Sequence, residues 1–138
     1  MWWFVRRPRT RGVKCIVRDG DRVLYVRHTY GDRGAWELPG GSLRRREEPA
    51  AAARREMSEE LGIDLAGLRQ VARIEVAGYH KRADLHAFAA RVPPGVALRL
   101  ARAEIAEARW APAAAPPRPL GPDAEALLDV VRGGAGAE

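Results

Sequence analysis

The hydrophobic residues of this chain fall mostly into short apolar runs separated by turn signals. Two such runs, VKCIV at 13–17 and VLYV at 23–26, flank the sequence RDGDR. An Asp-Gly pair between apolar runs is a strong hairpin signal, so two antiparallel strands are predicted here. Further strands are predicted at 36–38, 68–77, 83–92 and around 109–111.

One segment has the features of a helix instead. It is an Ala-rich run that begins at Pro49, a residue suited to the first helical position, and ends at Gly62, which can adopt the left-handed cap. A second helix is predicted from Asp123, acting as its N-cap, to about Arg132. Strands interleaved with two helices predict an α/β sandwich in which the helices cover opposite faces of a mixed sheet.

Three acids of the first helix share one flank. At about 100° per residue, Glu56, Glu59 and Glu60 lie beside a narrow apolar stripe formed by Ala50, Ala53, Met57 and Leu61. Glu59 has Arg55 four residues before it, but Glu56 and Glu60 have no cation three or four residues away. Such a like-charge pair costs a few tenths of a kcal/mol, and the helix dipole disfavours anions in this half of the helix.

A divalent cation is the simplest missing partner for these acids. Carboxylate oxygens suit Mg²⁺ or Mn²⁺, and the lack of a neighbouring His or Cys argues against zinc. The alternative is a solvated acidic edge on a surface helix.

The composition indicates one soluble domain. The 138 residues are 46% hydrophobic and 30% charged, and no apolar run approaches the roughly 20 residues of a membrane span. The whole of 1–138 is therefore taken as a single domain with an N-terminal extension at 1–10 and a frayed tail at 133–138, and a cytoplasmic location is expected. The single cysteine, Cys15, precludes an intrachain disulfide and is expected in the core.

The net charge of +6 favours polyanionic partners, but no nucleic-acid-binding motif accompanies it, so a nucleic-acid partner is not expected. The Trp2-Trp3-Phe4 patch leaves four roles open: an edge strand, packing under the sheet, a homodimer interface, or base stacking.

The stretch from Gly41 to Ile63 resembles the signature of the Nudix hydrolases, G-x5-E-x7-R-E-U-x-E-E-x-G-U, where U is a bulky aliphatic residue. Every fixed position is met, by Gly41, Glu47, Arg55, Glu56, Met57, Glu59, Glu60, Gly62 and Ile63. Family members often carry Gly just before the first Glu, where this chain has Arg46. The resemblance extends from about Arg11 to Arg132 and implies a Nudix-type α/β/α sandwich.

The resemblance also implies an activity and the residues that perform it. The expected reaction is Mg²⁺-dependent hydrolysis, with Mn²⁺ as an alternative, of the pyrophosphate bond in a nucleoside diphosphate linked to another moiety. The implied metal ligands are Glu56, Glu59 and Glu60, with the Gly40 carbonyl as a backbone ligand. The implied catalytic residues are Arg55, Glu56 and Glu59: Arg55 orients the site by pairing with an acid of the motif, Glu47 first, and Glu56 is the first candidate for the general base.

Outside the motif the expectations are less specific. Glu104 and Glu107, placed in a loop entering a short strand, are each either a further metal ligand or a surface acid. Arg44 and Arg46 are either phosphate contacts or solvated charges. Tyr79, in a turn, resembles in position a tyrosine associated with dinucleoside polyphosphate hydrolases, and the alternatives are base stacking or ordinary packing. The rival functions are a nucleotide-binding sensor without turnover and a basic nucleic-acid-binding module.

Overall fold

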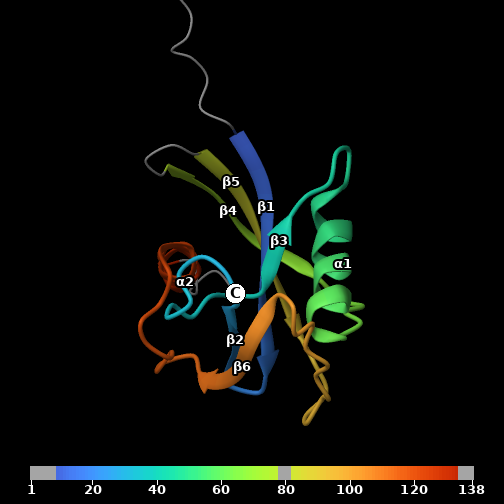
Figure 1. Ribbon diagram of the computed structural model, residues 1–138, viewed down its shortest axis with the longest axis vertical. Coiled ribbons are helices and arrows are strands. Elements are labelled where there is room, and N and C mark those ends of the chain that lie inside the picture. The colour runs from blue at the N-terminus through green and yellow to red at the C-terminus, as the bar shows by residue number, and fades with distance from the viewer. Residues whose placement is uncertain (1–8, 78–81, 134–138) are drawn as a thin grey trace, which may run out of the picture.

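The computed structural model of the chain describes residues 9–77 and 82–133, in which one mixed sheet of six strands is flanked by two helices (Figure 1). The strands are β1 (Arg9–Asp19), β2 (Arg22–His28), β3 (Gly40–Ser42), β4 (Arg69–Ala77), β5 (Arg82–Arg91) and β6 (Ile105–Pro112), and the helices are α1 (Pro49–Leu61) and α2 (Pro122–Gly133). Neither helix in this part of the chain has the length and apolar content that crossing a bilayer demands.

The strand β1 is central and its two edges are used differently. One edge pairs in parallel with β5 along nearly its whole length. The other edge is shared, because Gly12–Lys14 pair with β3 while only Arg18–Asp19 pair with β2. Between these two stretches the Cys15 N–H donates to the Pro39 carbonyl at 2.8 Å. Where β1 and β2 separate, residues 37–39 lie between them, since Glu37 bridges Val26 of β2 and Pro39 accepts from Cys15 of β1.

Alternate residues of the strands bury against different helices. On β1, Val13, Cys15 and Val17 belong to the core cluster that contains the buried face of α1, whereas Ile16 belongs to the cluster with α2. Figure 1 shows α1 and α2 on opposite sides of the sheet. The sandwich predicted from the pattern is thus confirmed, because a strand with both faces covered must be apolar in both phases of its period of two.

The predicted hairpin is also confirmed, with Gly20 at φ 62° in its two-residue turn. The first helix begins at Pro49 and is capped by Gly62 at φ 67° as expected. Cys15 is fully buried, as expected for a core residue.

The strand β1 already includes Arg9 and Thr10. The sheet therefore begins inside the range 1–10 that was expected to be an extension.

Three boundaries differ from the prediction. Residues 36–38 form only isolated bridges, to Val26 and Leu120, because Pro39 has no N–H to continue a ladder. The second helix begins at Pro122, which leaves Asp123 inside its first turn and not at the cap; a proline suits this position because its N–H would be unpaired there. Glu107 lies within β6 and not in the loop before it.

The loop between β3 and α1 contains a strained residue. The Glu47 N–H donates to the Arg44 carbonyl at 3.0 Å, which closes a tight turn, and Arg46 in its third position has φ 64°. This left-handed conformation is costly for any residue with a Cβ. It accounts physically for the glycine often found here in the family signature.

We expect Arg46→Gly to raise the free energy of unfolding by about 0.5–1 kcal/mol, because relief of the left-handed strain outweighs the extra entropy of glycine in the unfolded chain. Urea denaturation measures the change. The matched control is Arg45→Gly, whose backbone is outside the left-handed region and which should lower stability. Equal effects of the two changes would contradict the strain argument.

Candidate active site

Two glycines of β3 allow close approach of its neighbours, Gly41 that of α1 and Gly40 that of β1. A Cβ on Gly41 would lie 2.5 Å from the Cδ of Glu56, and a Cβ on Gly40 would lie 2.0 Å from the Val13 carbonyl oxygen. Neither distance is sterically allowed for a real side chain. Gly41 thus allows the Glu56 carboxylate to lie directly against the main chain of β3, while Gly40 allows β3 to lie close to β1.

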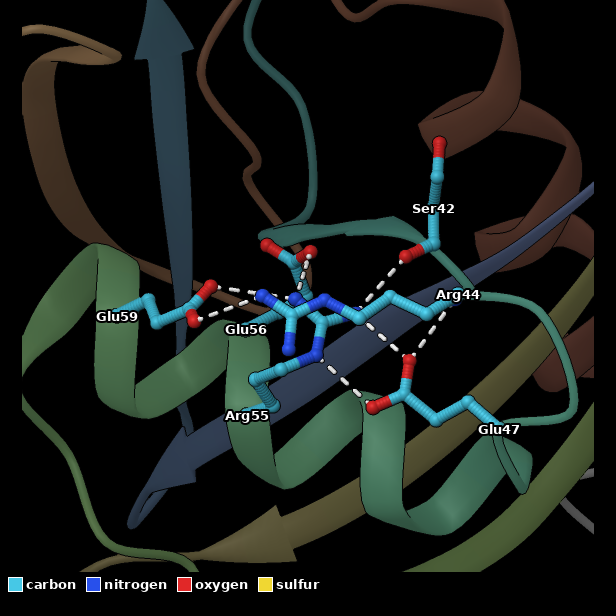
Figure 2. Close-up of polar contacts among 6 residues, drawn as sticks. All are labelled: Ser42, Arg44, Glu47, Arg55, Glu56 and Glu59. Atoms are coloured by element: carbon cyan, nitrogen blue, oxygen red, sulfur yellow. Dashed lines mark hydrogen bonds and ion pairs between the residues drawn. The ribbon is translucent and has the colours of Figure 1, made fainter.

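The guanidinium of Arg55 connects the acids of the motif, as Figure 2 shows. Its Nε and Nη2 donate to the two oxygens of Glu47 at 2.8 Å each, and Nη2 also donates to the Ser42 carbonyl at 3.0 Å. Its Nη1 donates to Glu56 at 3.0 Å and to Glu59 at 3.2 Å. The pairing of Arg55 with Glu47 expected from the sequence is therefore present, and it is bidentate.

The bond between Arg55 and Glu47 fixes the ionisation of these two groups. Hydrogen bonds from Arg55, followed by one from the Arg44 N–H, lower the pKa of Glu47 to about 2. The same bond to Glu47 raises the pKa of Arg55 above its usual range. Both groups stay charged near neutral pH, so Glu47 holds Arg55 in place and is unsuited to accept a proton during a reaction.

Glu60 has the opposite environment. It is 2% exposed, and its pKa is raised to about 8 by burial first and then by the charges of Glu56 and Glu104 and a hydrogen bond with Glu56, against a smaller lowering by Lys14. Its Oε1 is buried and has no hydrogen-bond partner among the described residues. A buried carboxylate oxygen left unpaired next to a second carboxylate costs free energy, and a bound cation would remove that cost.

The end of β2 and the segment after it form another side of the site, next to the acids. The pKa of the Tyr30 hydroxyl is raised by burial and by the charges of Glu60, Glu104, Glu37 and Glu56, so this exposed ring stands close to the acids. The His28 ring stacks on Tyr30 with centroids 4.9 Å apart.

His28 is itself buried, and burial lowers its pKa. Its Nε2 lies 4.0 Å from an oxygen of Glu37, and its Nδ1 has no hydrogen-bond partner within the described ranges. Sequence reasoning missed Lys14, His28, Tyr30 and Glu37 as site residues. The available signal was Lys14, a charge inside the apolar run VKCIV.

The two acids beyond the motif are separated by the structure. Glu104 lies near Glu60, whose pKa its charge raises, and its carbonyl accepts the Thr29 N–H at 2.9 Å. Glu107 is instead paired with Arg27 across β2 and β6 and lies 3.8 Å from Arg109. Only Glu104 therefore neighbours the acids of α1.

The candidate substrate contacts are either exposed at the edge of the site or lie outside the residues that the structure describes. Arg44 is largely exposed, and its Nη2 lies 3.5 Å from Glu59, itself half exposed. Arg46 is exposed in the turn described above. Tyr79 falls within 78–81, outside the described residues.

A divalent cation fits this donor set only after rearrangement. In the described ranges no three His, Cys, Asp or Glu side chains are arranged as a complete metal site, because Arg55 holds Glu56 and Glu59. The orphaned oxygen of Glu60, its partner Glu56 and the all-oxygen chemistry nevertheless match a hard cation. Nudix hydrolases generally use divalent metal ions.

Comparison with known proteins identifies the family. The model of the NUDIX domain matches residues 8–131. The chain belongs to the NUDIX domain family. The MutT NUDIX hydrolase from Burkholderia pseudomallei has the same fold, with a TM-score of 0.82 at 21% identity over 90% of this chain and 98% of that one.

Two curated relatives match shorter stretches of this NUDIX domain. A MutT-like protein of Streptomyces ambofaciens is 46% identical over 48 residues, which cover 35% of this chain and 30% of that protein. The CMP-5'-(N-acetyl-N-hydroxy-3-aminopropyl)phosphonate hydrolase of Streptomyces rubellomurinus is 39% identical over 72 residues, 49% of this chain and 34% of that protein. The chain thus spans about a third of the length of the curated relatives it matches.

In the metal-free protein, Glu60→Gln should increase stability by an amount that grows as pH rises from about 4.5 to about 8. The unfolded chain loses the Glu60 proton near 4.5, whereas the folded chain keeps it until about 8, so the wild type loses stability across this window and the neutral glutamine does not. Urea midpoints in EDTA at several pH values measure the difference. The exposed Glu48→Gln serves as control, and parallel pH profiles for wild type and Glu60→Gln would refute the burial argument.

Arg55→Lys should raise the pKa of Glu47 from about 2 toward the ordinary 4.5. Lysine keeps the positive charge but cannot donate two parallel N–H groups to one carboxylate. Carboxyl ¹³C NMR titration measures this pKa. The neighbouring exposed Arg54→Lys should leave it unchanged, and an unchanged Glu47 in Arg55→Lys would show that the fork does not set it.

Proposed function

We propose that this NUDIX domain hydrolyses the pyrophosphate bond of a nucleoside diphosphate linked to another moiety, with Mg²⁺ as the cofactor and Mn²⁺ as an alternative. The observation that carries the proposal is the buried Glu60 carboxylate, which has an unpartnered oxygen and lies beside Glu56. Two adjacent carboxylates with one shared proton are poised to exchange that proton for a cation.

In this proposal the cation is held by Glu56, Glu59 and Glu60 with the Gly40 carbonyl. Glu104 is the acid that completes the set, since its charge already acts on Glu60. Glu107 is excluded from it by its ion pairs with Arg27 and Arg109. When bound, the cation supplies neutralisation of the diphosphate and a more acidic water.

The chain's own residues orient the groups that react. Arg55 holds Glu56 and Glu59 through one nitrogen while its fork is fixed on Glu47. Glu56 is the candidate general base, because it is positioned by Arg55 on one side and by the Gly41 backbone on the other. A bound cation would balance the charges of Glu56 and Glu59 that Arg55 otherwise balances. Arg55 would still hold the β3–α1 loop through its bond to Glu47.

The substrate class is supported by the surroundings of the acids. Arg44 at the exposed rim is placed to meet a phosphate, and the stacked His28 and Tyr30 offer an aromatic wall to the group linked to it. One relative is named for hydrolysis of a CMP-linked phosphonate, which supports a nucleotide-type substrate here. The dinucleoside polyphosphate alternative rests on Tyr79, outside the described residues.

Glu59→Gln and Glu60→Gln are each expected to lower kcat on the order of 10³-fold at saturating Mg²⁺ while the protein stays folded. Phosphate or nucleotide release is measured over dNTPs, nucleotide sugars, ADP-ribose and dinucleoside polyphosphates with Mg²⁺ or Mn²⁺. Glu104→Gln should raise the Mg²⁺ concentration needed for half-maximal rate.

The matched control is Glu107→Gln, which removes a carboxylate only three residues from Glu104. It should retain the wild-type kcat and Mg²⁺ requirement. Wild-type turnover in Glu60→Gln would overturn the ligand assignment. Absence of turnover by the wild type with every substrate, together with nucleotide binding, would identify a sensor in place of an enzyme.

A further inference from the structure

A cavity lies between the sheet and the C-terminal part of α2. Its volume is about 400 Å³, and it is lined by Arg18 of β1, Arg69 of β4 and Arg91 of β5 above an apolar floor that includes Ile16, Val71 and Val131. Ile16, Val71 and Val131 belong to the core cluster that packs on α2. The cavity therefore opens on the face of the sheet opposite α1 and its carboxylates.

The strand register explains why three arginines gather there. Ile16 is opposite Ala89, and Ala89 is opposite Arg69, so one row crosses β1, β5 and β4. Two residues further along, Arg18 is opposite Arg91. Because side chains alternate between faces, the second row lies on the same face as the first. The register of the three strands therefore brings the arginines together, and their proximity does not depend on side-chain flexibility alone.

Two of the three arginine charges at this site, those of Arg18 and Arg91, have no acidic partner among the described residues. Like charges directly opposite on neighbouring strands are destabilising. Across residues 9–77 and 82–133, neither the Arg18 nor the Arg91 guanidinium forms an ion pair or side-chain hydrogen bond with an acid. Burial raises the pKa of the nearby Tyr25 hydroxyl, which has no hydrogen-bond partner among the described residues, and the positive charges of Arg132 and Arg18 oppose this rise. This end of the sheet is therefore strongly electropositive.

We propose that this cavity is a second binding site, separate from the carboxylates of α1, for a small organic phosphate. Arg18, Arg69 and Arg91 present planar N–H donors that match the oxygens of a phosphate. The apolar floor takes the non-phosphate part of the ligand, and the volume suits a small molecule. Since no acid of the motif faces the cavity, binding requires no divalent cation.

The probes are AMP and inorganic phosphate, titrated into the full chain in EDTA while methyl signals of Ile16, Val71 and Val131 are followed by NMR. We expect saturable shifts with AMP and weaker binding of inorganic phosphate, which cannot use the apolar floor. Arg91→Gln and Arg18→Gln should each raise the Kd for AMP about tenfold, as expected for loss of a hydrogen bond to a charged group. The matched control Arg54→Gln, which removes an exposed arginine from α1, should not.

Two further variants separate this site from the catalytic one and from misfolding. Glu60→Gln should bind AMP in EDTA as the wild type does, whatever its hydrolytic activity. Arg91→Lys should retain part of the affinity, and AMP should raise the Tm of the wild type more than that of Arg91→Gln. The proposal fails if these methyl signals do not shift, if Arg54→Gln weakens AMP as much as Arg91→Gln does, or if phosphate binds as tightly as AMP.

Discussion

The contact on which the site depends is the double hydrogen bond between Arg55 and Glu47. It ties the helix to the loop that precedes it, and the same guanidinium reaches the Ser42 carbonyl, so β3, the loop and α1 become one unit. Only because this arginine is fixed can its remaining nitrogen hold Glu56 and Glu59 side by side. The acids can therefore lie close together on α1 although their mutual repulsion destabilises the helix.

Burial then divides the acids by role. Glu47 is held ionised by donors, Glu59 is half exposed, and Glu60 is enclosed and keeps its proton to about pH 8. These differences arise from packing, since all three are glutamates within a short stretch of chain. The site thus contains one structural carboxylate, one at the rim and one that is poorly satisfied by hydrogen bonds.

The sequence predicted what local spacing determines. The ends of the first helix and its acidic flank follow from positions a few residues apart, and the pairing of Arg55 with Glu47 was implied by the resemblance to the Nudix signature. The side of the site at the end of β2 could not be predicted this way, because Lys14, His28 and Glu37 meet only where β2 leaves β1. The choice between Glu104 and Glu107 depended on the β2–β6 register, which places Glu107 opposite Arg27 just before the irregularity beside His28. The arginine-lined cavity could not be predicted from local spacing either, because it depends on the register of β1, β4 and β5.

The alternation along β1 has a consequence for how this chain can change over time. Its odd positions from Val13 to Val17 pack toward α1, while Ile16 and Arg18 face α2. Substitutions in one phase leave the other phase untouched, so the two faces can diverge independently under selection. A single-residue insertion or deletion in this strand would exchange both phases at once, so β1 should vary in residue identity but keep its length.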